Sequence, residues 1–207
     1  MLYWTRRSTR RKDGERLADR LILASASPRR AELLTSMGLR FEVYAPDVDE
    51  DIPGDPREVT LTLARRKARA AAAHFQGDTI LAADTLVSVD GEALAKPADE
   101  DDARRMLSML SGRWHSVFTG VCVLRGTYEQ AEAAETLVRF SALAPKDVAA
   151  YIRSGEPFGK AGAYAIQGMA GMYVPEIRGS FTNVVGLPTS LVRTMLESAG
   201  YPLAGRE

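Results

Sequence analysis

Two adjacent arginines after a turn of small residues could bind an anionic substrate. Residues 25–30 read Ser-Ala-Ser-Pro-Arg-Arg, and a serine followed by proline is typical of the start of a helix. Backbone N–H groups and the positive end of a helix dipole attract phosphate, and guanidinium groups add paired donors. A capped helix with solvated arginines is the alternative. The candidate anion-binding residues are Ser25, Ser27, Arg29 and Arg30.

A second group of candidates is acidic. Asp47, Asp49 and Glu50 share one predicted loop, and Asp84 directly follows the apolar segment 79–83, which predicts a buried strand. Mg²⁺ prefers one or two carboxylates together with phosphate oxygens, so these acids could hold a metal beside a phosphate site. A solvated turn is the alternative for the loop acids. Asp84 is different, because a carboxylate at the end of a buried strand is costly without a partner or a role.

Three lysines could neutralise phosphate charge. Lys67 lies on a predicted long helix, Lys96 precedes Pro97, and Lys160 stands in a Gly-Lys-Ala-Gly segment. Each could offset the charge that develops on a leaving pyrophosphate, although a solvated surface position is the simpler interpretation for any one of them alone. The segment 155–161 superficially resembles a P-loop, but it is one residue short and lacks the Ser or Thr that binds magnesium.

The composition argues against several other kinds of chemistry and partner. With two histidines and one cysteine, Cys122, the chain has too few soft ligands for a structural zinc site. Lys plus Arg and Asp plus Glu both number 27, so no global positive field favours nucleic acid. The sequence has neither an apolar run long enough for a transmembrane helix nor a secretory signal, so we expect no membrane association and a cytoplasmic protein.

The order of the predicted elements favours an α/β protein with a mixed sheet. The first 20 residues are basic and poor in aliphatic side chains, so we expect a flexible extension followed by one domain over residues 21–207. The pair Asp90-Gly91 predicts a hairpin turn. Predicted strands cover residues 21–24, 41–45, 79–83, 117–124 and 135–140, and predicted helices cover residues 28–37, 56–77, 99–111, 145–154 and 188–199.

An ordered series of motifs resembles the Maf family of nucleoside triphosphate pyrophosphatases. These motifs are Leu23–Arg30, Asp47–Glu50, Ala64–Ala68, Ala83–Thr85, Gly91–Glu92 with Lys96–Pro97, Lys160–Gly168 and Val185–Pro188, and the resemblance covers about residues 21–200. It implies a two-lobed fold similar to inosine triphosphate pyrophosphatases, usually a homodimer. It also implies hydrolysis of a nucleoside triphosphate to monophosphate and pyrophosphate with Mg²⁺, or with Mn²⁺ in its place.

The resemblance further implies roles for individual residues. Asp84 would accept a proton from the attacking water and contact the metal, and Glu50 would help to hold the metal. The residues that would position or neutralise the phosphates are Ser27, Arg29, Arg30, Lys67, Lys96 and Lys160.

Three positions distinguish the branches of this family. Arg29, Thr85 and Gln167 are similar to the dTTP/UTP branch, whereas the 7-methyl-GTP branch tends to have Trp, Gln and Glu there. The amide of Gln167 offers both a donor and an acceptor to a pyrimidine edge, while a glutamate would accept hydrogen bonds from a methylated guanine.

Two other functions stay open at this point. One is a pyrophosphatase for 7-methyl-GTP or another modified nucleotide. The other is a non-catalytic regulator of septum formation that acts through protein partners. A cleft that brings Arg29, Asp84 and Lys96 together would favour an enzyme, whereas an exposed apolar or charged patch would favour a partner-binding protein.

Overall fold

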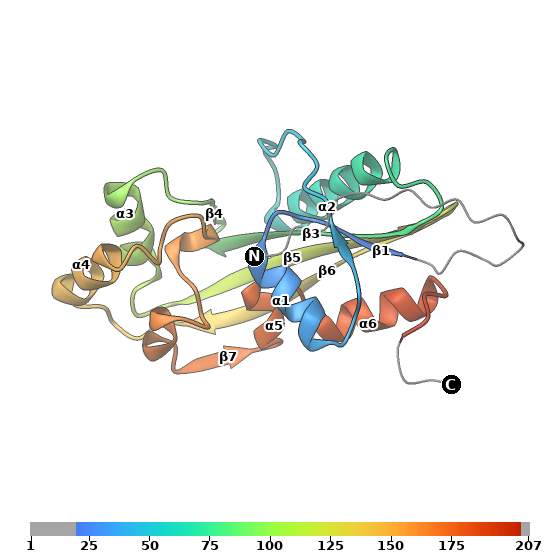
Figure 1. Ribbon diagram of the computed structural model, residues 1–207. Helices are drawn as coiled ribbons and strands as arrows, with labels where there is room; N and C mark the ends of the chain where they lie inside the picture. Colours follow the sequence, from blue (N-terminus) through green and yellow to red (C-terminus); the bar gives the residue numbers. More distant parts are fainter. Residues whose placement is uncertain (1–19, 204–207) are drawn as a thin grey trace, which may run out of the picture.

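A mixed sheet forms the centre of the computed structural model, which describes residues 20–203 (Figure 1). The strands are β1 (Leu21–Ala24), β2 (Glu42–Val43), β3 (Thr79–Val89), β4 (Glu92–Leu94), β5 (Trp114–Arg125), β6 (Tyr128–Arg139) and β7 (Glu176–Arg178). Within the described residues their order is β2-β1-β3-β5-β6-β7, with β4 paired to β3. β1 pairs in parallel with β2 and β3, and the other pairs are antiparallel. The predicted α/β fold with a mixed sheet is confirmed.

Helices cover both faces of the sheet. They are α1 (Pro28–Ser36), α2 (Pro56–Ala72), α3 (Glu100–Leu110), α4 (Pro145–Arg153), α5 (Phe181–Val185) and α6 (Thr189–Ser198), with short 3₁₀ helices η1 (Ala161–Ala163) and η2 (Met169–Tyr173). In Figure 1, α2 lies on one side of β1 and β3, α1 and α6 lie on the other side, and α3 and α4 gather at the opposite end of the sheet.

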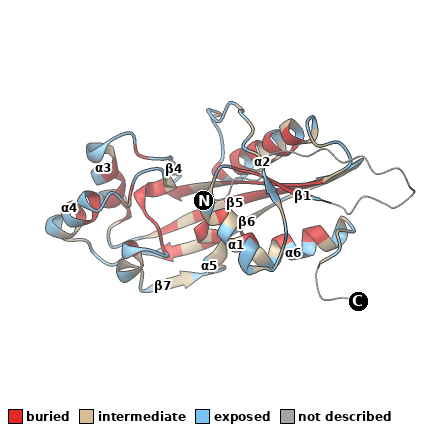
Figure 2. Ribbon diagram, viewed as in Figure 1, coloured by how far each residue is buried: buried red, intermediate tan, exposed pale blue. Residues whose placement is uncertain are grey.

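Three clusters of buried side chains hold these layers together, and Figure 2 shows the burial concentrated along the sheet. At one end, alternate residues of β3 serve opposite faces: Ile80 and Ala82 pack against alanines of α2, whereas Leu81 and Ala83 pack against α1 and α6. At the other end, Val87 and Val89 join residues of α3 and α4. β3 therefore supports two core regions. The first, around residues 80–83, has one cluster on each face of the sheet, and the second, around Val87 and Val89, includes α3 and α4. This agrees with the predicted two-lobed arrangement.

The position of Asp84 differs from the prediction. It was expected to follow the strand, but β3 continues through Asp84 to Val89, because β5 pairs with β3 as far as Ser88 and the added residues are mostly β-branched or apolar. The parallel neighbour β1 ends at Ala24, opposite Ala82. Asp84 thus lies inside a long strand, just beyond the carboxyl end of its shorter neighbour, and an open edge results there.

Several other elements differ in length or were not predicted. β2 is shorter than the expected strand 41–45, β5 and β6 are longer than expected, and neither α5 nor β7 was predicted. The hairpin prediction is confirmed, since Asp90 and Gly91 both have positive φ, 52° and 81°, as a two-residue type I′ turn requires. Ser27 occupies the N-cap position of α1, but its side chain makes no capping hydrogen bond.

Gly120 allows α2 to cross the sheet at close range. It pairs in register with Asp84, and a Cβ atom at this position would overlap the backbone carbonyl of Thr60 on α2. The absence of a side chain at Gly120 therefore sets the height of the helix that carries Lys67 above the strand that carries Asp84.

Gly120→Ala should lower the free energy of unfolding by about 1–3 kcal/mol, because the helix backbone cannot yield as a flexible side chain could. Chemical denaturation measures the change. The same variant should lose catalytic activity beyond its loss of folded protein, since α2 would move away from Asp84. Unchanged stability would show that the helix accommodates the methyl group without cost.

His115 is buried in the core region that includes α3 and α4, and one of its two ring nitrogens is hydrogen-bonded. Its Nε2 atom lies 2.8 Å from the Tyr164 hydroxyl, and its ring packs edge-on against Phe140 and Tyr164. Within residues 20–203, Nδ1 has no hydrogen-bond partner. Burial lowers the pKa of His115 from 6.5 to about 4, because a charged ring would be desolvated.

The folded protein should therefore lose stability in mild acid. Between pH 6.5 and pH 4, His115 is protonated in the unfolded chain but neutral in the folded protein. The free energy of unfolding therefore decreases as the pH is lowered through this range. The expected loss from this residue between pH 7 and pH 5 is about 2 kcal/mol. Unfolding measured across this range should be less dependent on pH in His115→Gln, whose amide can still pair with Tyr164. Equal pH dependence in both proteins would refute the assignment.

The described chain begins at Arg20, which pairs with Asp78 and Glu42 and whose carbonyl accepts a hydrogen bond from the Thr79 N–H. The rest of the predicted N-terminal extension lies outside the described residues. Among residues 20–203, no helix is long and apolar enough to cross a membrane.

Candidate active site

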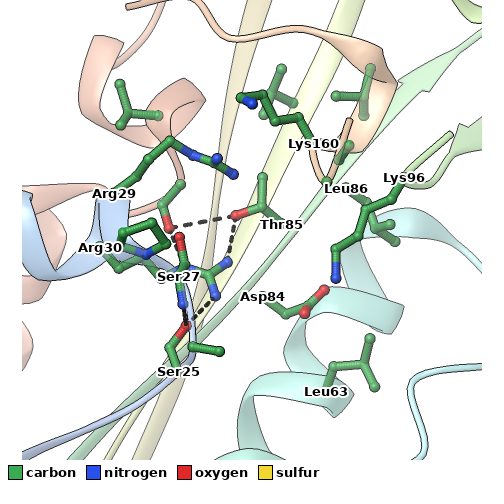
Figure 3. Close-up of a pocket in the computed structure, with 18 of the residues that line it drawn as sticks. Ser25, Ser27, Arg29, Arg30, Leu63, Asp84, Thr85, Leu86, Lys96 and Lys160 are labelled. Carbon is green, nitrogen blue, oxygen red and sulfur yellow. Dashed lines mark hydrogen bonds between the residues drawn. The ribbon is translucent and has the colours of Figure 1, made fainter. Parts of the chain in front are cut away.

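A pocket of about 510 Å³ opens beside β3, between the two core regions, and all the candidate site residues except the loop acids Asp47 and Asp49 line it. This volume is within the range of small-molecule sites. Figure 3 shows Arg29 and Lys160 reaching over Thr85, and Lys96 extending toward Asp84. The predicted residues on the pocket wall are Ser25, Ser27, Arg29, Arg30, Glu50, Lys67, Asp84, Thr85, Lys96, Lys160 and Gln167.

Lys67 joins two carboxylates on the floor of the pocket. Its Nζ atom lies 2.6 Å from Oδ1 of Asp84 and 2.6 Å from Oε1 of Glu50. The side chains of Lys67 and Asp84 are buried, whereas that of Glu50 is half exposed. Lys96, which is largely exposed, lies 3.8 Å from the other oxygen of Glu50. Acidic and lysine side chains therefore alternate along the pocket floor, in the order Asp84, Lys67, Glu50 and Lys96.

The charges around Glu50 favour its ionised form. Burial alone would raise the pKa of Glu50, but the hydrogen bond and charge of Lys67, with smaller contributions from Lys96 and Arg30, hold it below the ordinary value. Of the three acids predicted on this loop, Glu50 alone lines the pocket. Asp49 instead accepts a hydrogen bond from the Asp51 N–H.

The donor set of the floor fits a hard divalent cation. Glu50 and Asp84 present oxygens on either side of one point, now spanned by the Lys67 ammonium, and Mg²⁺ is commonly held by one or two carboxylates that substrate phosphates and water complete. Among the described residues, no cluster of three or more His, Cys, Asp or Glu side chains could enclose a metal. A cation here would therefore depend on the substrate for part of its coordination.

Three hydrogen bonds to the protein fix the Arg30 guanidinium in place. Its guanidinium is buried and donates to the Gly186 carbonyl at 2.8 Å, to Ser25 Oγ at 2.9 Å and to Thr85 Oγ1 at 3.0 Å. Burial lowers the pKa of Arg30, and the charge of Asp84 acts in the opposite direction. The three contacts hold the guanidinium against its own chain, so Arg30 orders Ser25 and Thr85 at the pocket wall.

Two residues behind Thr85 were missed from the sequence. Thr85 Oγ1 lies 2.9 Å from Thr119 Oγ1, and the Thr119 hydroxyl donates to the Asn183 carbonyl at 3.1 Å. Thr119 is the partner of Thr85 in the β3–β5 register. Thr119 is a polar residue within the apolar run of β5, which could have marked it as a site residue. Its contact with Thr85 follows only from the register of β3 and β5.

Arg29 and Lys160 supply the cations of the upper wall. Burial lowers the pKa of Arg29, partly offset by Glu32, and burial together with the charge of Arg29 lowers the pKa of Lys160. Two cations that disfavour each other would gain from an anion placed between them. Gln167 lines the same pocket and is exposed, so its amide is accessible to a ligand.

The pocket therefore combines two carboxylates, those of Glu50 and Asp84, with several cations within reach of one ligand. This is the equipment that phosphoryl chemistry needs, because catalysis there depends on positioning and on neutralising charge. The convergence of Arg29, Asp84 and Lys96 is the arrangement expected of an enzyme.

Comparisons with known proteins agree with this geometry. The sequence model of a family described as "Maf-like protein" matches residues 20–199. A dTTP/UTP pyrophosphatase from Anaeromyxobacter dehalogenans (strain 2CP-1) is 50% identical over 193 residues, which cover 90% of this chain and 97% of that protein. Another dTTP/UTP pyrophosphatase, from Thermococcus gammatolerans, is 48% identical over 186 residues, which cover 90% of this chain and 100% of that protein.

Proposed function

The chain belongs to the Maf family, and on that premise we propose that it hydrolyses nucleoside triphosphates, preferably dTTP and UTP, to the nucleoside monophosphate and pyrophosphate. The observation that carries the proposal is the cluster of Asp84, Lys67 and Glu50 on the floor of a pocket whose other charged residues are cations. Relatives whose sequences are about 50% identical to 90% of this chain are named for this activity.

In this reaction Asp84 accepts a proton from water, and the water oxygen forms a bond to the α-phosphorus. The bond from that phosphorus to the α–β bridging oxygen breaks, and the electron pair leaves with pyrophosphate. Lys67 and Lys96 stand at the floor, and Arg29 and Lys160 at the upper wall, to offset the charge on the leaving group. Ser25 and Ser27 line the start of α1, where its backbone N–H groups suit a phosphate.

Glu50 and Asp84 would hold Mg²⁺, with Mn²⁺ as a substitute, together with phosphate oxygens. Such a cation supplies charge stabilisation to the phosphates and lowers the pKa of a bound water. The carboxylate of Glu50 is kept ionised by its lysine neighbours, which prepares it for this role.

The preference for a pyrimidine follows from Arg29, Thr85 and Gln167, as in the dTTP/UTP branch of the family. The exposed amide of Gln167 can donate to one group and accept from another on a uracil or thymine edge. We also propose a homodimer in the cytoplasm, without nucleic-acid partners; the chain has equal numbers of acidic and basic side chains.

A substrate panel tests this function. The purified protein should release pyrophosphate and the monophosphate from dTTP and UTP only when Mg²⁺ or Mn²⁺ is present. The same rate in excess chelator would remove the metal from the reaction. Preferential cleavage of 7-methyl-GTP would move the protein to the other branch, and absence of cleavage of any triphosphate would favour the non-catalytic alternative.

A further inference from the structure

The loop that carries Gln167 is fastened at both of its ends to a pair of side chains that do not line the pocket. Glu156 accepts hydrogen bonds from the backbone N–H of Met169 at 3.0 Å and of Ala170 at 3.3 Å. On the other side of Gln167, the backbone N–H of Ala165 donates to the Tyr151 hydroxyl at 3.1 Å. Both attachments belong to one unit, because that hydroxyl donates to Oε1 of Glu156 at 2.7 Å.

The surroundings of the pair are built for this contact. Tyr151 is 2% exposed, so its hydroxyl has little access to water. Gly168 lies against the carboxylate, and a Cβ atom there would overlap the Glu156 carboxyl group. The Ser154 hydroxyl in turn accepts from the Glu156 N–H at 3.2 Å and donates to the Tyr151 carbonyl at 2.6 Å. Ser154 therefore ties the backbone of Glu156 to that of Tyr151, while the loop contacts the Glu156 carboxylate.

We propose that Tyr151 and Glu156 are positioning residues that fix the loop 165–170, and through it Gln167, for selection of the pyrimidine base. The inference rests on the proposed function, in which Gln167 reads the base. Neither residue touches the substrate. They act by removing freedom from the loop before binding, so that the amide meets the base at a lower entropic cost.

The charge on Glu156 is maintained by the contacts it makes. Burial would raise its pKa, but the N–H of Met169, the Tyr151 hydroxyl, the N–H of Ala170 and the charge of Lys160 together hold it below the ordinary value. The carboxylate therefore stays an acceptor for all three donors near neutral pH. The charge of Glu156 also acts to raise the pKa of Lys160 on the pocket wall. The pair therefore lies near both Gln167, which would read the base, and Lys160, which would bind phosphate.

The test compares two substrates in Tyr151→Phe. The phenyl ring keeps the packing of α4, but it loses the link between Glu156 and the Ala165 N–H. The variant loses both hydrogen bonds of the hydroxyl, but Glu156 keeps its contacts with the Met169 and Ala170 N–H groups. For UTP, KM should therefore rise about twofold to tenfold, the net effect of a single hydrogen bond, with kcat nearly unchanged. For ribose 5′-triphosphate, which has no base, both constants should stay the same. Hydrogen exchange at the amides of residues 165–170 should become faster in the variant.

Four further variants complete the design: two single substitutions, Gln167→Ala, and Gln167→Ala combined with Tyr151→Phe. Tyr128→Phe also removes a hydroxyl that is hydrogen-bonded, to Gln130, but on β6 outside the pocket, and should change neither substrate. Glu156→Gln should weaken UTP selectivity as Tyr151→Phe does, which provides a second test if one variant folds poorly. In a Gln167→Ala background, Tyr151→Phe should have no further effect on the ratio of the two substrates.

The outcomes separate the two levels of the proposal. An unchanged ratio of kcat/KM for UTP over ribose 5′-triphosphate in Tyr151→Phe would overturn the positioning role alone. A further loss of selectivity in the Gln167→Ala background would also overturn it, because Tyr151 would then act by another route. If the unaltered protein cleaves neither substrate, the proposed function fails, and the positioning role fails with it.

Discussion

Replacing Asp84 with asparagine should lower kcat for UTP by roughly 100 to 10,000-fold, the contribution of a general base. Asparagine has nearly the same shape and can still accept a hydrogen bond from Lys67, which lies 2.6 Å from Asp84 Oδ1. It cannot accept a proton from water at neutral pH, and it is a weaker ligand for Mg²⁺. Loss of the metal in addition would make the decrease larger.

Asp78→Asn is the matched control for this variant. The side chains of Asp78 and Asp84 are both 11% exposed and both pair with a cation, but Asp78 pairs with Arg20 outside the pocket. Both variants should show similar changes in melting temperature, and only Asp84→Asn should lose turnover. A rate above about a tenth of the original would be more than the loss of a general base permits, and it would shift attention to Glu50.

Replacing Lys67 with methionine should reduce kcat by about 100 to 1,000-fold, as when one preorganised charge-stabilising donor is removed. The aliphatic part of Lys67 is buried, and methionine fills a similar volume, so the fold should persist. The two carboxylates that Lys67 joins would then face each other without the intervening cation. Steady-state hydrolysis of UTP with saturating Mg²⁺ measures the loss.

The pH profile gives Lys67→Met a second readout. Lys67 is the main group that lowers the pKa of Glu50, so that pKa should rise in the variant, and activity should begin to fall at a higher pH on the acid side. Lys67→Arg should retain part of the rate, since the charge remains. Lys146→Met, at an exposed position on α4, should match the original protein; a comparable loss there would mean that general charge, rather than position, decides the rate.

The fold and the set of pocket residues could be predicted because local signals and family motifs agreed. The apolar run 21–24, the Ser-Pro start of α1 and the Asp90-Gly91 turn each specify their own local conformation. The length of β3 could not be predicted in this way. It depends on pairing with β5, which is far away in the sequence, and this pairing carries the strand past Asp84.

Contacts between distant segments also explain what was missed around the site. Arg30 is separated by many residues from the Gly186 carbonyl and Thr85 that receive its hydrogen bonds, so the sequence alone indicated a cation but not its orientation. Glu156 lay in a segment considered only for its likeness to a P-loop. Its contacts with Tyr151 and with the loop beyond Gln167 follow from the turn after α4, which has no distinctive pattern of its own.

Hydrolysis of UTP in H₂¹⁸O with Mg²⁺ tests the central claim most directly. If Asp84 prepares a water that attacks the α-phosphorus, mass spectrometry should find one ¹⁸O atom in UMP and unlabelled pyrophosphate, in equal amounts. Label in the pyrophosphate would place the attack on the β-phosphorus, and formation of UDP with orthophosphate would place it on the terminal phosphate. Either result would contradict the proposed reaction.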